Sequence, residues 1–225
     1  MKTVAALMVL AGVAASANAA VTLAEWTFEV SVPATAGPHA AEGGLNAGAA
    51  SLASGFHALA TVYSNPVGNG SAESFSSNTW SVGDYYQFTT STAGYNNITI
   101  AWDQTSSNTG PRDFNIQWST DGVVFNNIGG VYSVLANAAP NPVWTSASGS
   151  PLYTFNVAGP AALDNQAQIY IRLTNANTIS ANGGTVAAGG TDRVDNVIIG
   201  GTLVPAPASL ALVGLAGLVA GRRRR

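Results

Sequence analysis

An alternation of apolar and polar side chains, repeated over short segments, limits the fold of this chain more than any other feature. Its clearest apolar positions are Ile98, Ile100 and Trp102, followed by Phe114, Ile116 and Trp118. Successive side chains of a strand point to opposite faces of a sheet, so a period of two indicates strands with one buried face. Residues 20–203 show no segment with the period of about 3.6 residues that an amphipathic helix requires.

The same pattern predicts eight to nine strands separated by turns rich in Gly, Asn, Ser and Pro. They are expected at residues 21–32, 56–63, 84–90, 95–103, 113–120, 123–128, 152–157, 168–174 and 193–202. Asp121-Gly122 is typical of a hairpin turn. Residues 34–59 are ambiguous, and residues 64–79 are expected to form a loop. We therefore predict an all-β fold, a single two-sheet sandwich of jelly-roll type over residues 20–203.

The amino-acid composition excludes some kinds of binding partner and some kinds of stabilising cross-link. Cysteine is absent, which excludes disulfides and thiolate metal sites. The chain has 8 Lys and Arg against 11 Asp and Glu. Lys2 and the four terminal arginines are five of these basic residues, so residues 20–203 keep three arginines against all eleven acids, a formal net charge of −8. Such a surface repels phosphate backbones, and we expect no nucleic-acid partner.

Residues 1–19 have the three parts of a secretory signal peptide. A positive start precedes the apolar residues 4–15, and Ala17-Asn18-Ala19 provides an exit of small residues. We predict that signal peptidase recognises Ala17 and Ala19 and cleaves before Ala20. The remainder of the chain is then exported.

Residues 204–225 form a tail that also has three parts. It contains a motif with Pro205 and Pro207, an apolar stretch over residues 208–221, and finally Arg222, Arg223, Arg224 and Arg225. As a helix, the apolar stretch would rise about 21 Å, short of a hydrocarbon core of about 30 Å. The arginines would hold its end on the cytoplasmic side. On physical grounds the tail is either a marginal anchor or a temporary membrane segment.

The order of these three parts resembles the PEP-CTERM sorting signal, a tail also labelled the ice-binding protein C-terminal domain. The resemblance implies an exported bacterial protein that an exosortase-type transpeptidase recognises at an inner-membrane stage. It further implies transient membrane insertion through a C-terminal apolar helix, removal of the tail, and delivery to the cell surface or a biofilm matrix. Ala206 departs from the family, which most often has Glu there. Ice binding itself is not expected, because the chain has no periodic ladder of Thr or Asn.

Residues 113–125, DFNIQWSTDGVVF, carry a second resemblance. This segment is similar to a hairpin of galactose-binding-like sandwiches, such as discoidin-type and carbohydrate-binding modules. Trp118 and Phe125 occupy its two aromatic positions. The resemblance implies the sandwich fold and assigns no ligand.

Glu29 and Asp195 lie near the two ends of the predicted domain, where calcium-binding sandwich modules resemble one another. The resemblance implies a structural Ca²⁺ held by both carboxylates and by backbone carbonyls, a ligand set that suits this ion. The alternative is that Asp195 caps a turn and Glu29 is exposed. No cofactor is expected to be required.

Aromatic side chains at strand ends or in loops are candidates for contact with a sugar, because sugar sites need exposed aromatic platforms beside amides and carboxylates. Tyr85, Tyr132, Trp144 and Tyr153 occupy such places. Tyr132 and Trp144 are the ones we predict to face a ligand. The alternative is that these aromatics belong to the core.

Catalysis is not expected. His39 and His57 are the only histidines, and no serine lies in a G-x-S-x-G turn. Glu25 and Glu29 share a strand face. A glycosidase needs two carboxyl groups, but the same pair of residues also occurs on the solvent-exposed edge of a sheet. The sequence therefore predicts a non-enzymatic structural or adhesive protein of the cell surface or extracellular matrix. The alternative is a carbohydrate-binding module that recognises an extracellular polysaccharide.

Overall fold

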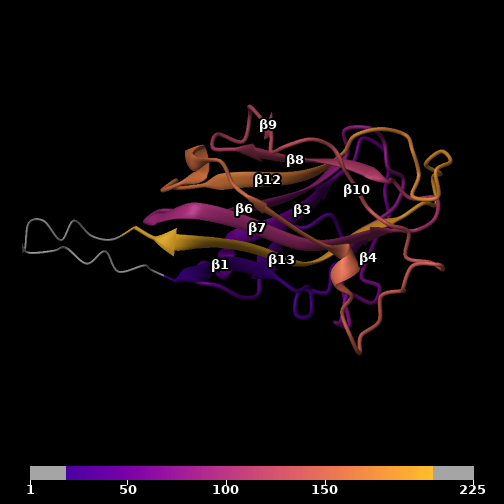
Figure 1. Cartoon of the computed structure of the whole chain (residues 1–225), viewed down its shortest axis with the longest axis horizontal. Helices are drawn as coiled ribbons and strands as arrows, with labels where there is room; N and C mark the ends of the chain where they lie inside the picture. Colours follow the sequence, from indigo (N-terminus) through magenta and orange to yellow (C-terminus); the bar gives the residue numbers. More distant parts are fainter. Residues whose placement is uncertain (1–18, 205–225) are drawn as a thin grey trace, which may run out of the picture.

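Two antiparallel sheets pack against each other in the computed structural model, which describes residues 19–204 (Figure 1). Sheet A has the order β11 (Thr154–Ala158), β7 (Tyr95–Ser106), β13 (Asp192–Leu203), β5 (Phe75–Ser77) and β4 (Tyr63–Ser64), with β1 (Ala20–Trp26) also paired to β13. Sheet B has the order β10 (Tyr132–Ser133), β8 (Asp113–Ser119), β12 (Ile169–Asn175), β6 (Tyr85–Thr90), β3 (Gly48–Phe56) and β2 (His39–Ala41), with β9 (Asn126–Asn127) against β8. Two 3₁₀ turns, η1 (Pro151–Tyr153) and η2 (Ala161–Leu163), flank β11. The predicted all-β, two-sheet sandwich is confirmed.

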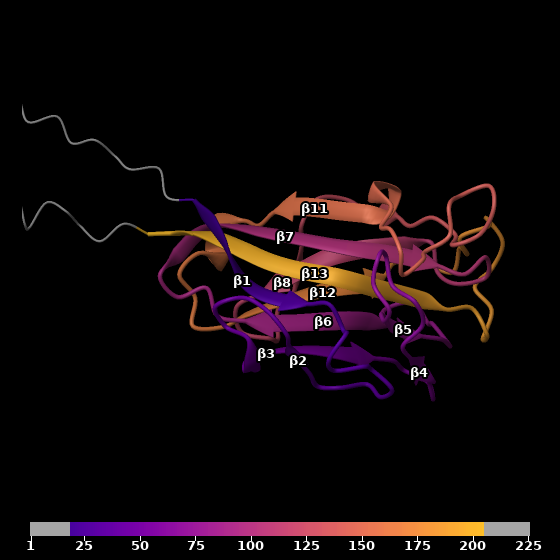
Figure 2. The same ribbon diagram turned by 90° about the horizontal axis from the view of Figure 1, so that it is seen from below.

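The chain crosses repeatedly from one sheet to the other. Strands β5, β7, β11 and β13 belong to sheet A, and β6, β8 and β12, which alternate with them along the chain, belong to sheet B. This alternation is the winding of a jelly roll. The first and last strands are neighbours, with Ala20 opposite Thr202 and Trp26 opposite Val197. Both ends of the described chain therefore leave the same end of the sandwich (Figure 2).

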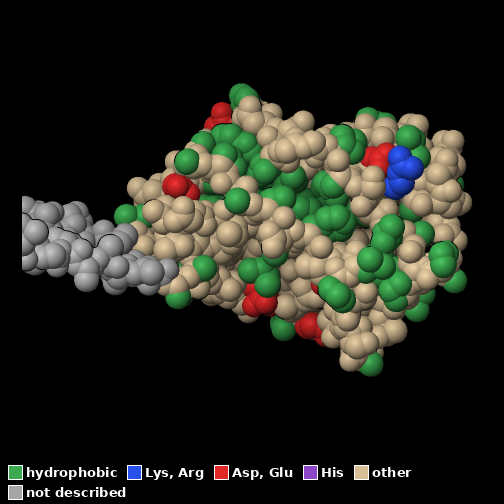
Figure 3. All heavy atoms as spheres, viewed as in Figure 1, with side chains coloured by type: hydrophobic (Ala, Val, Ile, Leu, Met, Phe, Trp, Pro, Cys, Tyr) green, Lys and Arg blue, Asp and Glu red, His purple; other side chains and the backbone are tan. Residues whose placement is uncertain are grey.

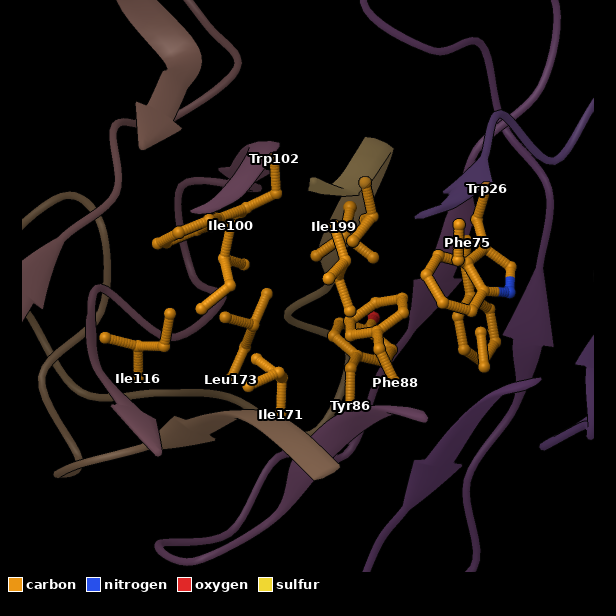
Figure 4. Packing of buried hydrophobic residues seen from close by; sticks show 14 of the residues in the cluster. Trp26, Phe75, Tyr86, Phe88, Ile100, Trp102, Ile116, Ile171, Leu173 and Ile199 are labelled. Atoms are coloured by element: carbon orange, nitrogen blue, oxygen red, sulfur yellow. The ribbon is translucent and has the colours of Figure 1, made fainter. Parts of the chain in front are cut away.

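The core lies between the two sheets and consists of the inward-facing residues of their alternating strands (Figure 4). Ile98, Ile100 and Trp102 of β7 are buried, as are Ile169, Ile171 and Leu173 of β12. Each such side chain stabilises the fold by about 1.5–3 kcal/mol relative to exposure. The inward positions predicted for these two strands are confirmed.

The first strand ends at Trp26 rather than at residue 32. Phe28 adopts a φ of 60° and turns the chain. The Glu42 carboxylate then accepts the backbone N–H groups of Glu29 and Val30 at 3.1 and 3.0 Å, which fixes the turn. Phe28 remains buried, but Val30 is 83% exposed. The prediction of one strand over residues 21–32 is wrong because a distant carboxylate holds the backbone of residues 29–31.

Three other local predictions also differ from the structure. Residues 57–62 connect β3 to β4 and are not a strand, whereas β5 lies inside the segment 64–79 that was expected to be a loop. After the Asp121-Gly122 turn, only Asn126 and Asn127 pair with β8. The remaining six predicted strands are present, with ends shifted by a few residues.

Within residues 19–204, no helix has the length and apolar character needed to cross a membrane. The predicted C-terminal apolar helix falls outside the described residues, as does almost all of the predicted signal peptide.

Candidate functional site

The outer face of sheet B carries aromatic and polar side chains on the side opposite the core. Strand register defines three rows, each crossing β8, β12, β6 and β3 in turn. The rows are Asn115, Thr174, Tyr85 and Phe56; Gln117, Arg172, Gln87 and Ser54; and Ser119, Tyr170, Thr89 and Leu52. Residues directly opposite one another on adjacent strands share a face. None of these positions is acidic, although residues 20–203 carry eleven acidic side chains.

Arg172 is clamped between two aromatic rings at the centre of this face. Its Cζ atom lies 3.9 Å from the ring centroid of Tyr85 and 3.4 Å from that of Phe125. Its Nε donates a hydrogen bond of 2.8 Å to Gln87 Oε1. Phe56 stacks on Tyr85, with ring centroids 4.8 Å apart and planes at 23°. A stacked pair of rings, with Phe56 41% exposed, therefore lies beside a guanidinium of fixed orientation.

The connection between β8 and β9 covers one side of the outer face. Asp121 Oδ1 accepts the backbone N–H of Val123 at 2.8 Å, and this bond, with others in the loop, lowers the pKa of Asp121. Gly122 lies against Tyr170, where an added Cβ would come within 2.9 Å of the ring. The hydrogen bonds within the loop and the close contact between Gly122 and Tyr170 hold this connection in place. The connection in turn places Phe125 over the outer face.

Several polar groups on the outer face have no hydrogen-bond partner within residues 19–204. They are the hydroxyl of Tyr85, the side-chain amide of Asn115, Nε2 of Gln87, and Nη1 and Nη2 of Arg172. These residues are all partly exposed, so water satisfies the groups. A ligand rich in hydroxyls can replace that water without leaving a donor or acceptor unpaired.

Tyr132, which was predicted to face a ligand, lines a separate apolar cleft of about 210 Å³. The cleft lies between the β7–β11 edge of sheet A and the β8–β10 edge of sheet B, and Phe155 and Ile128 contribute to its walls. Figure 3 shows hydrophobic side chains gathered between these edges. The Tyr132 hydroxyl donates inward to Gln104 Oε1 at 2.7 Å, and burial raises its pKa. Tyr132 therefore offers the cleft its ring but not its hydroxyl.

Trp144 was also predicted to face a ligand, and the structure contradicts this. The side chain is 3% exposed. Its ring lies edge-on to Tyr153 at a centroid distance of 5.9 Å, and the Arg193 guanidinium lies 5.2 Å from it. An indole buried this far stabilises the loop by packing and presents no ring face to a sugar.

Glu29 and Asp195 contact the same loop at different places. Asp195 Oδ2 accepts the backbone N–H of Asn69 at 2.8 Å and the hydroxyl of Ser71 at 2.5 Å. Glu29 is exposed, and its Oε1 accepts the backbone N–H of Glu73 at 2.7 Å. Both residues therefore contact one loop, but their carboxylates do not come together as ligands of one metal ion.

The partners of Asp195 do not fit a bound cation in this arrangement. N–H and O–H donors occupy both of its oxygens, with Oδ1 accepting the backbone N–H of Asn196 at 2.8 Å. A calcium ion would have to displace these donors. Calcium therefore remains a prediction from the sequence pattern, and a calcium titration of the melting temperature tests it.

The position of Asp195 in the fold shifts the pKa of its carboxyl group. It is fully buried and pairs with Asp103 across β13 and β7. Burial, and to a lesser extent the charge of Asp103, raises the pKa of Asp195 to about 6. The cluster is therefore a source of pH-dependent stability.

His57 forms hydrogen bonds with the geometry of a Ser-His-Asp triad. Its Nε2 lies 3.0 Å from Ser77 Oγ, and its Nδ1 lies 3.1 Å from Asp84 Oδ2. Ser77, however, is 0% exposed, and the hydroxyl of Tyr86 lies 2.8 Å from the same Oγ. Burial also lowers the pKa of His57. A substrate has no route to a serine buried in this way, so the three residues form a hydrogen-bonded link between β5 and the chain segments that follow β3 and precede β6.

The residues predicted to direct export lie at the limits of the described chain or beyond them. Ala17, Pro205, Pro207 and the terminal arginines fall outside the described residues. Ala19 is the first described residue, and Ala20 begins β1.

The sequence indicated Tyr85 as an aromatic candidate and Phe125 only as a structural position of the hairpin, and neither Phe56 nor Arg172 was predicted as a site residue. The signal for Arg172 was present, because it alternates with the inward Ile171 and Leu173 on β12. No pattern within one segment could join it to Phe56, since three different strands must first come into register.

No family model matches this chain, and no curated protein matches it. Among solved structures, it is similar to the K1 cleaved adhesin domain of Lys-gingipain from Porphyromonas gingivalis W83, with 13% identity, 78% of this chain and 95% of that one covered, and a TM-score of 0.44. It is also similar to the CBM22-1 xylan-binding domain from Paenibacillus barcinonensis, with 11% identity, coverage of 86% and 99%, and a TM-score of 0.45. At TM-scores below 0.5, these likenesses assign neither ligand nor residue roles to this chain.

Proposed function

We propose that the domain of residues 20–203 binds carbohydrate through the outer face of sheet B. The observation that carries the proposal is the stacked pair of Phe56 and Tyr85 beside unpaired donors, in strand rows that contain no acidic side chain. A sugar ring is apolar on its faces and polar around its edge, so it needs an aromatic platform with directional hydrogen-bonding groups beside it. The outer face offers both within three adjacent rows.

The amides and the arginine supply the directional part of the recognition. Asn115 and Gln87 offer amide groups, and Arg172 offers N–H donors held in one plane by Tyr85 and Phe125. Because the rings and the Gln87 bond fix the guanidinium before a ligand arrives, little side-chain entropy is lost on binding.

The domain has a binding role without catalysis in this proposal. The one Ser-His-Asp geometry in residues 19–204 is closed to substrates, because Ser77 is 0% exposed. The resemblance of the two ends supports an exported protein, processed by signal peptidase and an exosortase-type transpeptidase through an inner-membrane intermediate. In this proposal the domain binds an extracellular polysaccharide, and its role is adhesion to that polysaccharide at the cell surface or in a biofilm matrix.

A binding screen with residues 20–203 tests this proposal. The protein is incubated with an array of bacterial and plant polysaccharide fragments, and each hit is measured by calorimetry. Tyr85→Ala removes the ring on which Phe56 stacks and is expected to weaken binding about tenfold or more. Leu152→Ala, which changes a 53% exposed side chain on η1, is the surface control and should bind as the wild type does. An array without hits, or binding that Tyr85→Ala leaves unchanged, contradicts the proposal.

A further inference from the structure

Arg172 and Arg193 both lack a carboxylate oxygen within 4.0 Å in the described domain, but only Arg172 has no acidic residue among the charges that shift its pKa. Arg112 donates two hydrogen bonds of 2.8 Å to the carboxylate of Asp113. Arg193 lies near Asp192, whose charge partly offsets the effect of burial on the arginine's pKa. Within residues 19–204, no carboxylate oxygen lies within 4.0 Å of Arg172.

The surroundings of Arg172 leave its charge uncompensated. Its neighbours are the rings of Tyr85 and Phe125 and the amide of Gln87. Partial burial lowers the pKa of Arg172. A guanidinium with both faces covered by rings has lost much of its hydration, and an anion that reaches its free edge restores part of the lost stabilisation.

The free edge of Arg172 has the geometry that a carboxylate requires. Nε is bonded to Gln87, so Nη1 and Nη2 form the remaining fork of N–H donors. A planar guanidinium binds a planar carboxylate through two parallel hydrogen bonds, which a lysine cannot reproduce. Because the Tyr85 ring fixes the plane of this fork, the platform and the cation have a constant relation to each other.

We propose that Arg172 selects sugars that bear a carboxylate, so that the ligand of the outer face is a uronic-acid-containing polysaccharide. The inference rests on the proposed carbohydrate binding and names its ligand class. The sugar ring packs on the exposed ring of Phe56 and along the edge of Tyr85, while its carboxylate accepts hydrogen bonds from Nη1 and Nη2 of Arg172.

The net charge of −8 does not oppose this selection at the outer face. Five of the eleven acids are buried, namely Asp84, Asp103, Asp113, Asp192 and Asp195. None of the eleven occupies the outward rows of sheet B. At 0.15 M salt, exposed charges separated by more than about 8 Å are largely screened. The excess negative charge therefore repels long polyanions at low salt. It repels a single uronate beside Arg172 much less.

Matched pairs of oligosaccharides test the proposal. The probes are oligomers of glucuronate, galacturonate and mannuronate, each paired with its carboxyl-reduced neutral form, measured by calorimetry at 0.15 M salt. Wild-type protein is expected to bind at least one uronate oligomer about tenfold more tightly than its reduced form, the effect of a charge-assisted bidentate bond. Arg172→Gln should reduce that ratio to about one. Arg172→Lys should leave a smaller ratio than wild type, because a point charge replaces the fork.

The outcomes separate this inference from the proposed function. If the reduced oligomers bind as tightly as the acidic ones and Tyr85→Ala weakens both, carbohydrate binding stands and acid selection is overturned. If none of the probes binds and neutral glycans on the array do, selection is overturned in the same way. If no glycan of any kind binds, both proposals fail. Melting temperatures of the Arg172 variants, which should stay within a few degrees of wild type, show whether a lost ratio reflects unfolding.

Discussion

Asp195→Asn should change how the stability of the domain depends on pH. The folded-state pKa of Asp195 is about 6, raised by burial from its ordinary value of 3.8. Between these two values the folded state holds a proton that the unfolded state releases. Stability therefore falls as pH rises from about 3.8 to about 6, and the loss is complete above that window.

The magnitude follows from the two pKa values. A gap of about two pH units, at about 1.4 kcal/mol each, corresponds to about 3 kcal/mol of stability in all, of which about 2.5 kcal/mol is lost between pH 4 and pH 7. Asparagine carries no charge in this range, so the variant lacks this contribution to the slope. Its amide nitrogen would oppose a donor of the cluster, such as the backbone N–H of Asn196, but that cost does not depend on pH.

Urea denaturation of wild type and Asp195→Asn at half-unit steps from pH 4 to pH 7.5 measures the effect. The wild-type stability minus that of the variant should decrease by about 2.5 kcal/mol as pH rises through this range. Asp121→Asn is the control, since hydrogen bonds lower the pKa of Asp121 and its contribution is instead lost as pH falls below 3.8. A wild-type-minus-variant difference that is constant with pH would refute the assignment of a raised pKa to Asp195.

Two further predictions concern the core and a close backbone contact. Tyr132→Phe removes a donor to Gln104 and should destabilise the fold by about 1 kcal/mol in urea denaturation, and an unchanged midpoint would contradict the assigned bond. Gly110→Ala places a Cβ 2.1 Å from the carbonyl oxygen of Thr191 and should cost about 1–3 kcal/mol, whereas Gly130→Ala, with nothing within 4 Å, should be near neutral. Equal melting temperatures for the two alanine variants would contradict the close approach of Gly110 to Thr191.

The long strands could be predicted from the sequence because each contains its own evidence. Ile98, Ile100 and Trp102 alternate with polar residues, and so do Ile169, Ile171 and Leu173. An alternating strand with one buried face needs no knowledge of its partners to be identified.

The short strands and the chain turns depended on contacts between distant residues. The three-residue strand β5 exists because it pairs with β13 and β4, and its Ser76 and Ser77 carry no hydrophobic period. The first strand was extended too far because nothing near Phe28 reveals that Glu42 binds the following backbone.

The candidate site was predictable only in part, for the same reason. Tyr85 could be selected as an aromatic at a strand end. Its stacking with Phe56 and its contact with Arg172 require β3, β6 and β12 to be in register. Trp144 was misassigned because a loop position in the sequence does not reveal that the loop folds over the indole.

The most direct test of carbohydrate binding by the outer face of sheet B is an NMR titration of ¹⁵N-labelled protein, residues 20–203, with the tightest-binding oligosaccharide from the array. The largest shift changes should come from Tyr85, Gln87 and Arg172, together with the side-chain amides of the same face. Resonances of Tyr132 and Phe155, in the apolar cleft, should change little. Shift changes concentrated in that cleft, or none on the outer face at saturating ligand, would contradict carbohydrate binding by the outer face of sheet B.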